Sequence, residues 1–143
     1  DLAVRFSRCC NPVPGDEIVG FVTRGRGVSI HRTDCINVIN LPEDERGRLI
    51  DAEWQVAENP TSTEQYSTEI QIFANNRIGL FADISKVFTE KQIDITSMNV
   101  RTSKQGRATI IMTFDIHGTE ELNRITDKIR QIDGVLDIQR TTG

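Results

Sequence analysis

The order of hydrophobic patterns in the second half of this 143-residue chain limits its fold more than any other feature. Residues 67–75, 94–102, 107–116 and 135–142 have the alternation or β-branched content of strands. Between them, residues 78–93 and 119–135 place apolar side chains at helical spacing, with Thr119 as the expected N-cap and Gly134 as the expected C-cap of the second helix. Those side chains are Leu80, Ile84, Val87 and Phe88, then Leu122, Ile125, Ile129 and Ile132. The order βαββαβ predicts a ferredoxin-like antiparallel sheet with both helices on one face.

The first half is predicted to be a small β-rich unit. Residues 17–23 and 27–32 form a predicted hairpin around an Arg-Gly-Arg-Gly turn. A short helix over 33–40 follows, with Thr33 or Asp34 as its N-cap and Cys35, Ile36 and Ile39 along one side. Residues 49–56 read as one connector strand before a polar stretch. We therefore expect an α+β protein with two domains, residues 1–62 and 63–143.

Composition narrows the class of protein. Hydrophobic residues make up 37% and charged residues 27%, which suits a globular chain with a core. There is no apolar run long enough to span a membrane and no signal peptide, so we expect a cytoplasmic protein without a membrane partner. A net charge of −4 argues against a general nucleic-acid coat and against DNA as a partner. The chain starts at Asp1, which suggests an excised piece of a longer protein.

Two segments resemble a known family. Residues 75–85, NNRIGLFADIS, within the βαββαβ order resemble the ACT regulatory module. Residues 8–38, RCCNPVPGDEIVGFVTRGRGVSIHRTDCINV, resemble the conserved-cysteine domain of the RelA/SpoT stringent-response proteins, also called their zinc-finger or ribosome-intersubunit (RIS) domain. The resemblance implies a parent enzyme that moves pyrophosphate from ATP to GTP or GDP, and often hydrolyses the product (p)ppGpp.

The resemblance also implies that the catalytic domains precede this region. The sequence has no phosphate-binding glycine loop before a helix, no His-Asp pair and no carboxylate cluster on one face. We therefore expect no catalytic residues in this piece. The expected role is regulatory.

The cysteines allow two interpretations. Cys9, Cys10, His31 and Cys35 supply three thiols and an imidazole, a zinc-type ligand set, with His31 and Cys35 spaced as on one helical face. Adjacent residues on a strand point to opposite sides, so both cysteines reach one ion only if the chain turns there, and Pro12, Pro14 and Gly15 are candidates for that turn. Alternatively, one thiol packs in a small core as an apolar group while the other simply lies near His31. The cofactor is left unknown, with zinc as the candidate.

The predicted hairpin is rich in cationic side chains. Arg24, Arg26, His31 and Arg32 are expected close together along one edge. Guanidinium groups pair well with phosphate, and the resembled family senses uncharged tRNA on the ribosome, so these residues are candidate RNA contacts. The alternative is an ordinary solvated turn.

The resemblance to ACT modules implies side-by-side dimers that bind amino acids at their seam. The candidate ligand residues are Asn75, Asn76, Ile78, Gly79 and Leu80 in the first strand-to-helix loop, and Ile95, Ser97, Met98 and Asn99 on the second strand. Backbone amides at the helix start favour a carboxylate, and the apolar wall suits a branched side chain. The alternative is that the asparagines cap the helix and Gly79 serves packing.

These expectations combine into one hypothesis. The chain is a regulatory piece of a (p)ppGpp synthetase/hydrolase that docks on the ribosome and tRNA and dimerises to control distant catalytic domains. The rival hypothesis is an ACT module that senses branched-chain amino acids and has no role with RNA.

Overall fold

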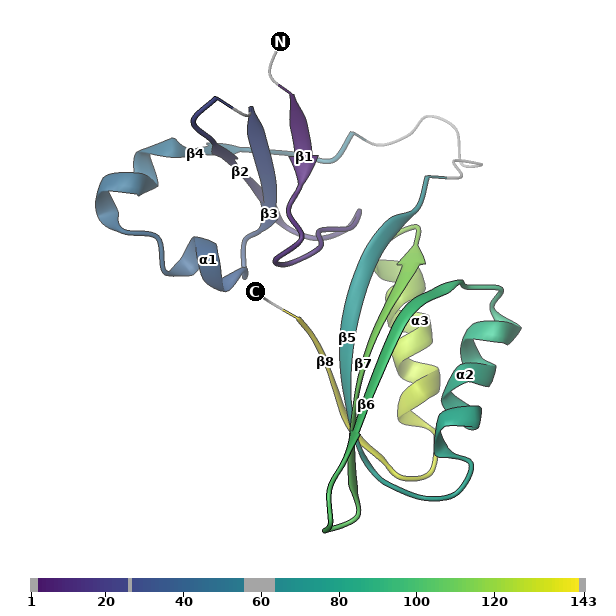
Figure 1. Cartoon of the computed structure of the whole chain (residues 1–143). Helices are drawn as coiled ribbons and strands as arrows, with labels where there is room; N and C mark the ends of the chain where they lie inside the picture. Colours follow the sequence, from purple (N-terminus) through teal and green to yellow (C-terminus); the bar gives the residue numbers. More distant parts are fainter. Residues whose placement is uncertain (1–2, 26, 56–63, 142–143) are drawn as a thin grey trace.

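The computed structural model describes residues 3–25, 27–55 and 64–141, which form two four-stranded sheets (Figure 1). The first sheet has the order β1-β3-β2-β4 and the second the order β6-β7-β5-β8. The strands of the first sheet are β1 (Val4–Phe6), β2 (Ile18–Val22), β3 (Val28–Arg32) and β4 (Leu49–Asp51). Those of the second are β5 (Tyr66–Asn75), β6 (Ile95–Thr102), β7 (Arg107–Ile116) and β8 (Val135–Arg140). The boundary predicted between residues 62 and 63 lies outside the described residues.

The first sheet is built on the predicted hairpin. Strands β2 and β3 pair antiparallel from Ile18 opposite Arg32 to Val22 opposite Val28. Strand β1 adds to β3 in parallel, and β4 adds to β2. A 3₁₀ helix, Glu43–Arg48, leads into β4, which is shorter than the predicted connector strand.

The short helix of the first half differs from its prediction. Helix α1 (Ile36–Ile39) has Cys35 at its N-cap rather than Thr33 or Asp34, and no side chain caps it. Ile36 and Ile39 are exposed, while Val38 is buried. With only four residues, α1 is a single turn, so its inward side is fixed by Cys35 and Val38 packing together rather than by an extended apolar stripe.

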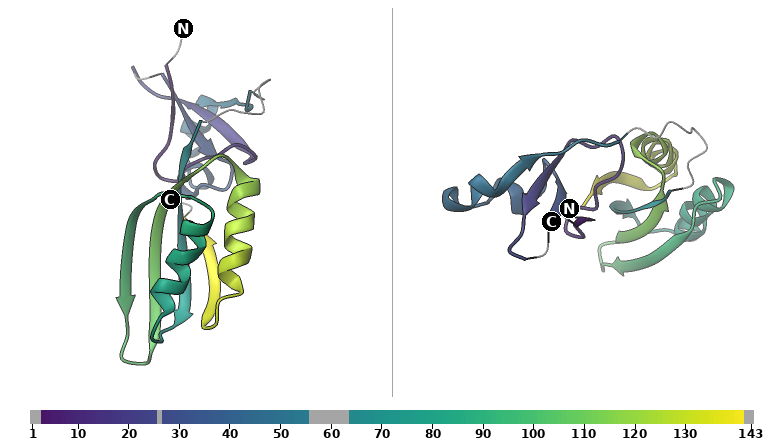
Figure 2. Two further views of the ribbon diagram at one scale, coloured as in Figure 1. Left: turned by 90° about the vertical axis from the view of Figure 1, so that its right-hand side faces the viewer. Right: turned by 90° about the horizontal axis from the view of Figure 1, so that it is seen from above.

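The second half has the predicted βαββαβ order. Strands β5 and β7 form a continuous antiparallel ladder from Tyr66 opposite Ile116 to Asn75 opposite Arg107. Helices α2 (Leu80–Glu90) and α3 (Thr119–Arg130) both lie on one side of the sheet (Figures 1 and 2). Helix α3 begins after Gly118 and ends before Gln131, so Thr119 is its first residue rather than its cap, and Gly134 lies in the following turn. The fold class is as predicted.

The main hydrophobic core lies between this sheet and its helices. Alternation on β5 buries Ile70 and Ile72, and Phe88 and Phe114 meet edge to face with ring centroids 4.8 Å apart. Phe73 and Phe81 are only half-buried. One residue of the first half, Val13, is fully buried in this same core.

An aromatic cluster also joins the two halves. Trp54 stacks on Phe6 at 5.3 Å, and Tyr66 meets both rings edge-on. The Trp54 indole N–H donates to the backbone oxygen of Asp16 at 3.0 Å. Trp54, itself half-buried, therefore ties the segment after β4 to β1 and β5. Among the described residues, no helix is both long and apolar enough to cross a membrane.

Candidate metal centre and ligand sites

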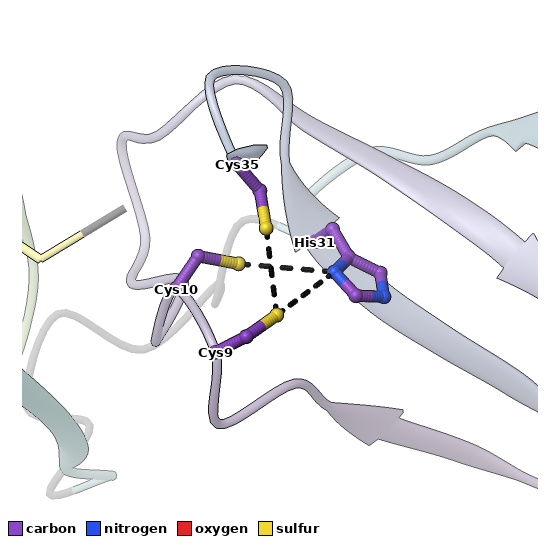
Figure 3. A group of neighbouring side chains, drawn as sticks. All are labelled: Cys9, Cys10, His31 and Cys35. Atoms are coloured by element: carbon purple, nitrogen blue, oxygen red, sulfur yellow. Dashed lines mark hydrogen bonds between the residues drawn. The ribbon is translucent and has the colours of Figure 1, made fainter. Parts of the chain in front are cut away.

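Three thiols and one imidazole converge at one end of the first sheet (Figure 3). Cys9 and Cys10 lie in the turn that follows β1, His31 lies on β3, and Cys35 lies just before α1. Their candidate ligand atoms all lie within 4.8 Å of one another. The predicted convergence of these four residues is therefore present in the structure.

A backbone turn lets the adjacent cysteines point the same way. The Asn11 N–H donates to the Ser7 oxygen at 3.0 Å, and Asn11 has a positive φ of 49°. Asparagine tolerates this conformation better than most residues. The turn thus precedes Pro12, Pro14 and Gly15, which were expected to form it. His31 and Cys35 also do not share a helix, because the chain leaves β3 between them.

The distances within the cluster are close to those of a tetrahedral metal site. The Sγ atoms of Cys9 and Cys35 are 3.4 Å apart, and Cys9 Sγ is 3.4 Å from His31 Nδ1. Cys10 Sγ is 3.9 Å from the same nitrogen. Zinc held by thiolates at about 2.3 Å and an imidazole at about 2.0 Å needs ligand atoms roughly 3.5 to 3.8 Å apart. The donor set fits Zn²⁺, and the separations of 3.4 to 3.9 Å lie within about 0.4 Å of the required ones, whereas a pair as far apart as 4.8 Å would have to close by about 1 Å around an ion.

Neighbouring groups orient two of these ligands. Ser29, two residues before His31 on the same strand face, lies 3.0 Å from His31 Nε2 through its hydroxyl. In the tautomer whose Nε2–H donates to Ser29, Nδ1 presents its lone pair to the thiols. The backbone N–H of Arg32 donates to Cys10 Sγ at 3.3 Å. Sequence reasoning missed Ser29, although its i, i+2 spacing from His31 on a strand was an available signal.

The thiols differ in their acid strength without a metal. Burial raises the pKa of Cys10 to about 12 and also raises the pKa of Cys35. Burial alone would raise the pKa of Cys9, but hydrogen bonds from Ser7, Asn37 and Cys35 outweigh it and lower that pKa. Burial lowers the pKa of His31, which favours the neutral imidazole that metals bind. A cation would offset the cost of ionising the buried thiols.

The three candidate RNA contacts that the structure describes do not share one exposed edge. Arg24 is exposed at the hairpin tip, whereas Arg26 lies outside the described residues. His31 turns both ring nitrogens inward, to the thiols and to Ser29. Arg32 is buried, and its guanidinium donates to the backbone oxygens of Cys10 and Thr141 and pairs with Asp34.

The predicted ACT ligand loop is well defined. Gly79 has a φ of 85°, which favours glycine, and Ile78 is fully exposed. Asn75 and Asn76 are also exposed, but Leu80 is buried in the core.

Arg77 holds this loop in place. Its guanidinium donates to the backbone oxygens of Asp133 and Ile78 and pairs with Asp83 at 2.7 Å. Sequence reasoning missed Arg77. The available signal was Asp83, an acidic residue in the first turn of α2 and a possible partner for a nearby arginine.

The second group of ligand candidates lies elsewhere on the sheet. Ile95 is opposite Phe114 on β7, whereas Asn75 is opposite Arg107. At about 3.3 Å per strand residue, the two levels are roughly 23 Å apart along β7. Ile95 packs against the core, and the other members are exposed: Ser97, Met98 and Asn99. One chain therefore does not bring the loop and the start of β6 together.

Comparisons with known proteins identify both halves. Residues 1–55 match the RelA/SpoT RIS domain, and residues 62–140 match the ACT domain. GTP pyrophosphokinase of Streptomyces coelicolor is 39% identical over 142 residues, which cover 99% of this chain and 16% of that protein. GTP pyrophosphokinase of Escherichia coli K12 is 37% identical over 144 residues, covering 100% of this chain and 19% of that protein.

A third relative has a name that includes hydrolysis. The bifunctional (p)ppGpp synthase/hydrolase RelA of Mycobacterium tuberculosis is 37% identical over 141 residues, covering 99% of this chain and 18% of that protein. The chain thus spans less than a fifth of the length of these three relatives. The matched part is their regulatory region, so their catalytic domain is not included.

Proposed function

This chain belongs to the RelA/SpoT family of GTP pyrophosphokinases, and we propose that it regulates (p)ppGpp synthesis and hydrolysis by catalytic domains elsewhere in its parent protein. The observation that carries the proposal is the match of the whole chain, cysteine unit and ACT unit together, to enzymes of this activity. Regulation of this kind requires that binding at these surfaces differs between two states of the parent. We place this activity in the cytoplasm.

The first half is proposed to hold a zinc ion and to dock on ribosomal RNA and tRNA. Cys9, Cys10, His31 and Cys35 would hold the ion, which would contribute folding free energy to a unit with a small core of its own. Arg24, with 84% of its side chain exposed, is the described hairpin arginine best placed to meet phosphate.

The second half is proposed to dimerise through β6. This strand is an edge of its sheet, and Met98 and Val100 on it are each 37% exposed. An exposed edge with apolar side chains is a template for strand pairing. Antiparallel pairing of two β6 strands would bring Ile95 and Ser97 of the second copy to the end of the sheet where the loop over residues 75–80 lies. That arrangement would assemble the two groups of ligand candidates.

Cosedimentation with ribosomes carrying uncharged tRNA tests the RNA role. We expect the chain to bind, and Arg24→Gln to weaken binding and reduce the salt slope by about 1. Arg130→Gln, an exposed arginine on α3, is the matched control and should leave binding unchanged. Failure of the unaltered chain to cosediment at low salt would contradict the proposal.

The rival function, a branched-chain amino-acid sensor without an RNA role, is favoured by one observation, the fully exposed Ile78 in an otherwise fixed loop. Calorimetric titration with valine and leucine distinguishes the two. If the chain releases heat on binding valine or leucine and does not cosediment with ribosomes, the rival is supported. If it cosediments with ribosomes and shows no such heat, the rival is excluded.

A further inference from the structure

The loop that carries two of the candidate metal ligands continues directly onto the ACT domain. We call residues 9–16 the cysteine loop. Beyond Cys10, its Val13 is fully buried in the ACT core, and the Pro14 oxygen accepts the Thr119 N–H at the start of α3 at 2.8 Å. A Cβ added to Gly118 would lie 2.9 Å from that Pro14 oxygen. The loop and the first turn of α3 are therefore in close contact.

A buried ion pair fixes the end of the cysteine loop. Arg140, in β8, places its two terminal nitrogens 2.7 and 3.0 Å from the Asp16 carboxylate oxygens and donates to the Asn11 oxygen at 3.1 Å. Only 9% of the Asp16 side chain and 18% of the Arg140 side chain are exposed. Asp16 also accepts the Val13 N–H at 2.8 Å. Bidentate pairs of this kind are strongly directional, so Arg140 sets the position of the loop immediately after Cys10.

A second arginine links the metal centre to the same strand. Arg32 donates from one nitrogen to the Cys10 oxygen and to the Thr141 oxygen, each at 3.2 Å. Its backbone N–H donates to Cys10 Sγ. Cys10 is thus held by Arg32 on one side and by Asn11, its neighbour in the chain, on the other. Arg32 is in turn hydrogen-bonded to Thr141, and Asn11 to Arg140, so both contacts connect Cys10 to the ACT half.

We propose that metal binding at Cys9, Cys10, His31 and Cys35 is coupled to the docking of the cysteine loop on the ACT domain, with Asp16 and Arg140 as positioning residues for Cys10. An ion that fixes Cys10 fixes the loop in the conformation that meets β8, and a docked β8 holds Cys10 in place for the ion. Such coupling is reciprocal by thermodynamic necessity. The inference deepens the proposed zinc centre and rests on it.

The zinc affinity of the 143-residue chain tests this inference. Zn²⁺ is titrated against a chromophoric chelator with the unaltered chain and with two variants that act from the ACT side. Arg140→Gln removes three bonds to the cysteine loop, and Gly118→Ala inserts a methyl group against Pro14 without changing charge. Gly118 has a φ of 173°, which alanine also adopts, so its effect is steric rather than conformational.

Both variants should bind zinc more weakly, by about 5-fold to about 150-fold, the usual range of coupling between sites. Matched controls are Arg130→Gln on the exposed face of α3 and Gly47→Ala, whose added Cβ meets open space. Neither control should change the affinity. Far-UV circular dichroism checks that each variant is folded, and because the two test variants act by different means, either one alone suffices if the other unfolds.

Trp54 provides an independent readout, since it is the chain's one tryptophan and donates to Asp16. Removing the metal should shift its emission to longer wavelength in the unaltered chain and much less in Arg140→Gln. Equal zinc affinity in the unaltered chain and both variants would overturn the coupling while leaving the metal centre intact. No zinc uptake by the unaltered chain would overturn both.

Discussion

Replacing Val13 by alanine should destabilise the helices of the ACT half, although Val13 belongs to the RIS half. The side chain is 0% exposed and lies among the core residues of the second sheet. The substitution removes two methyl groups, worth about 1.6 kcal/mol in transfer free energy at about 0.8 kcal/mol each. The remaining cavity raises the expected loss to about 2 to 3 kcal/mol.

Urea unfolding followed by circular dichroism at the helical band measures this loss. The band reports mainly α2 and α3, because α1 has only four residues. With a slope near 2 kcal/mol per molar urea, the midpoint should fall by about 1 M. Val4→Ala is the control, since Val4 is 60% exposed on β1 and its loss should stay below about 0.5 kcal/mol.

Equal midpoints for Val13→Ala and Val4→Ala would refute the reasoning. That result would mean that the cysteine loop leaves the ACT core before the helices unfold, so Val13 contributes nothing to their stability. A loss of helix stability close to the expected value would show that the two halves unfold as one unit at this point.

Two further predictions concern the metal centre and the dimer. Burial raises the pKa of Cys10 to about 12 and raises the pKa of Cys35, so both thiols are protonated at pH 7.5 without metal. Zinc uptake should then release at least two protons, counted by calorimetry in buffers of different ionisation enthalpy, and affinity should fall as the pH falls. Met98→Lys should convert a β6-paired dimer to monomer in sedimentation velocity, because a lysine on a sheet edge opposes strand pairing. A dimer that persists would place the interface elsewhere.

The sequence predicted the ACT half well because its signals are local. The alternation of Ile70 and Ile72 and the helical spacing of Leu80, Ile84 and Phe88 each follow from one element packing on one core. Cap positions were less accurate. Thr119 has the right chemistry for a cap, but its backbone N–H bonds to Pro14 of the other domain, which sets the start of α3.

The candidate metal ligands were predicted as a set, but their geometry was not. Thiols and an imidazole can be recognised as candidate ligands from residue type alone. The turn at Asn11 and the position of His31 on a strand depend on pairing with distant segments, which residue type does not reveal. The role of Arg32 shows the same limit. An arginine beside a hairpin suggests a surface contact, and only the tertiary structure shows that it satisfies the backbone oxygens of Cys10 and Thr141.

The pairing of Asp16 with Arg140 joins residues 124 positions apart, and this separation has a consequence for biosynthesis. At about 5 to 20 residues per second, translation needs roughly 6 to 25 s to reach Arg140 after Asp16 has been made. During that interval the nascent thiols have neither Arg140 nor Thr141 to hold their loop. The cysteine loop is therefore made before β8 but takes its final shape only after β8 has been added.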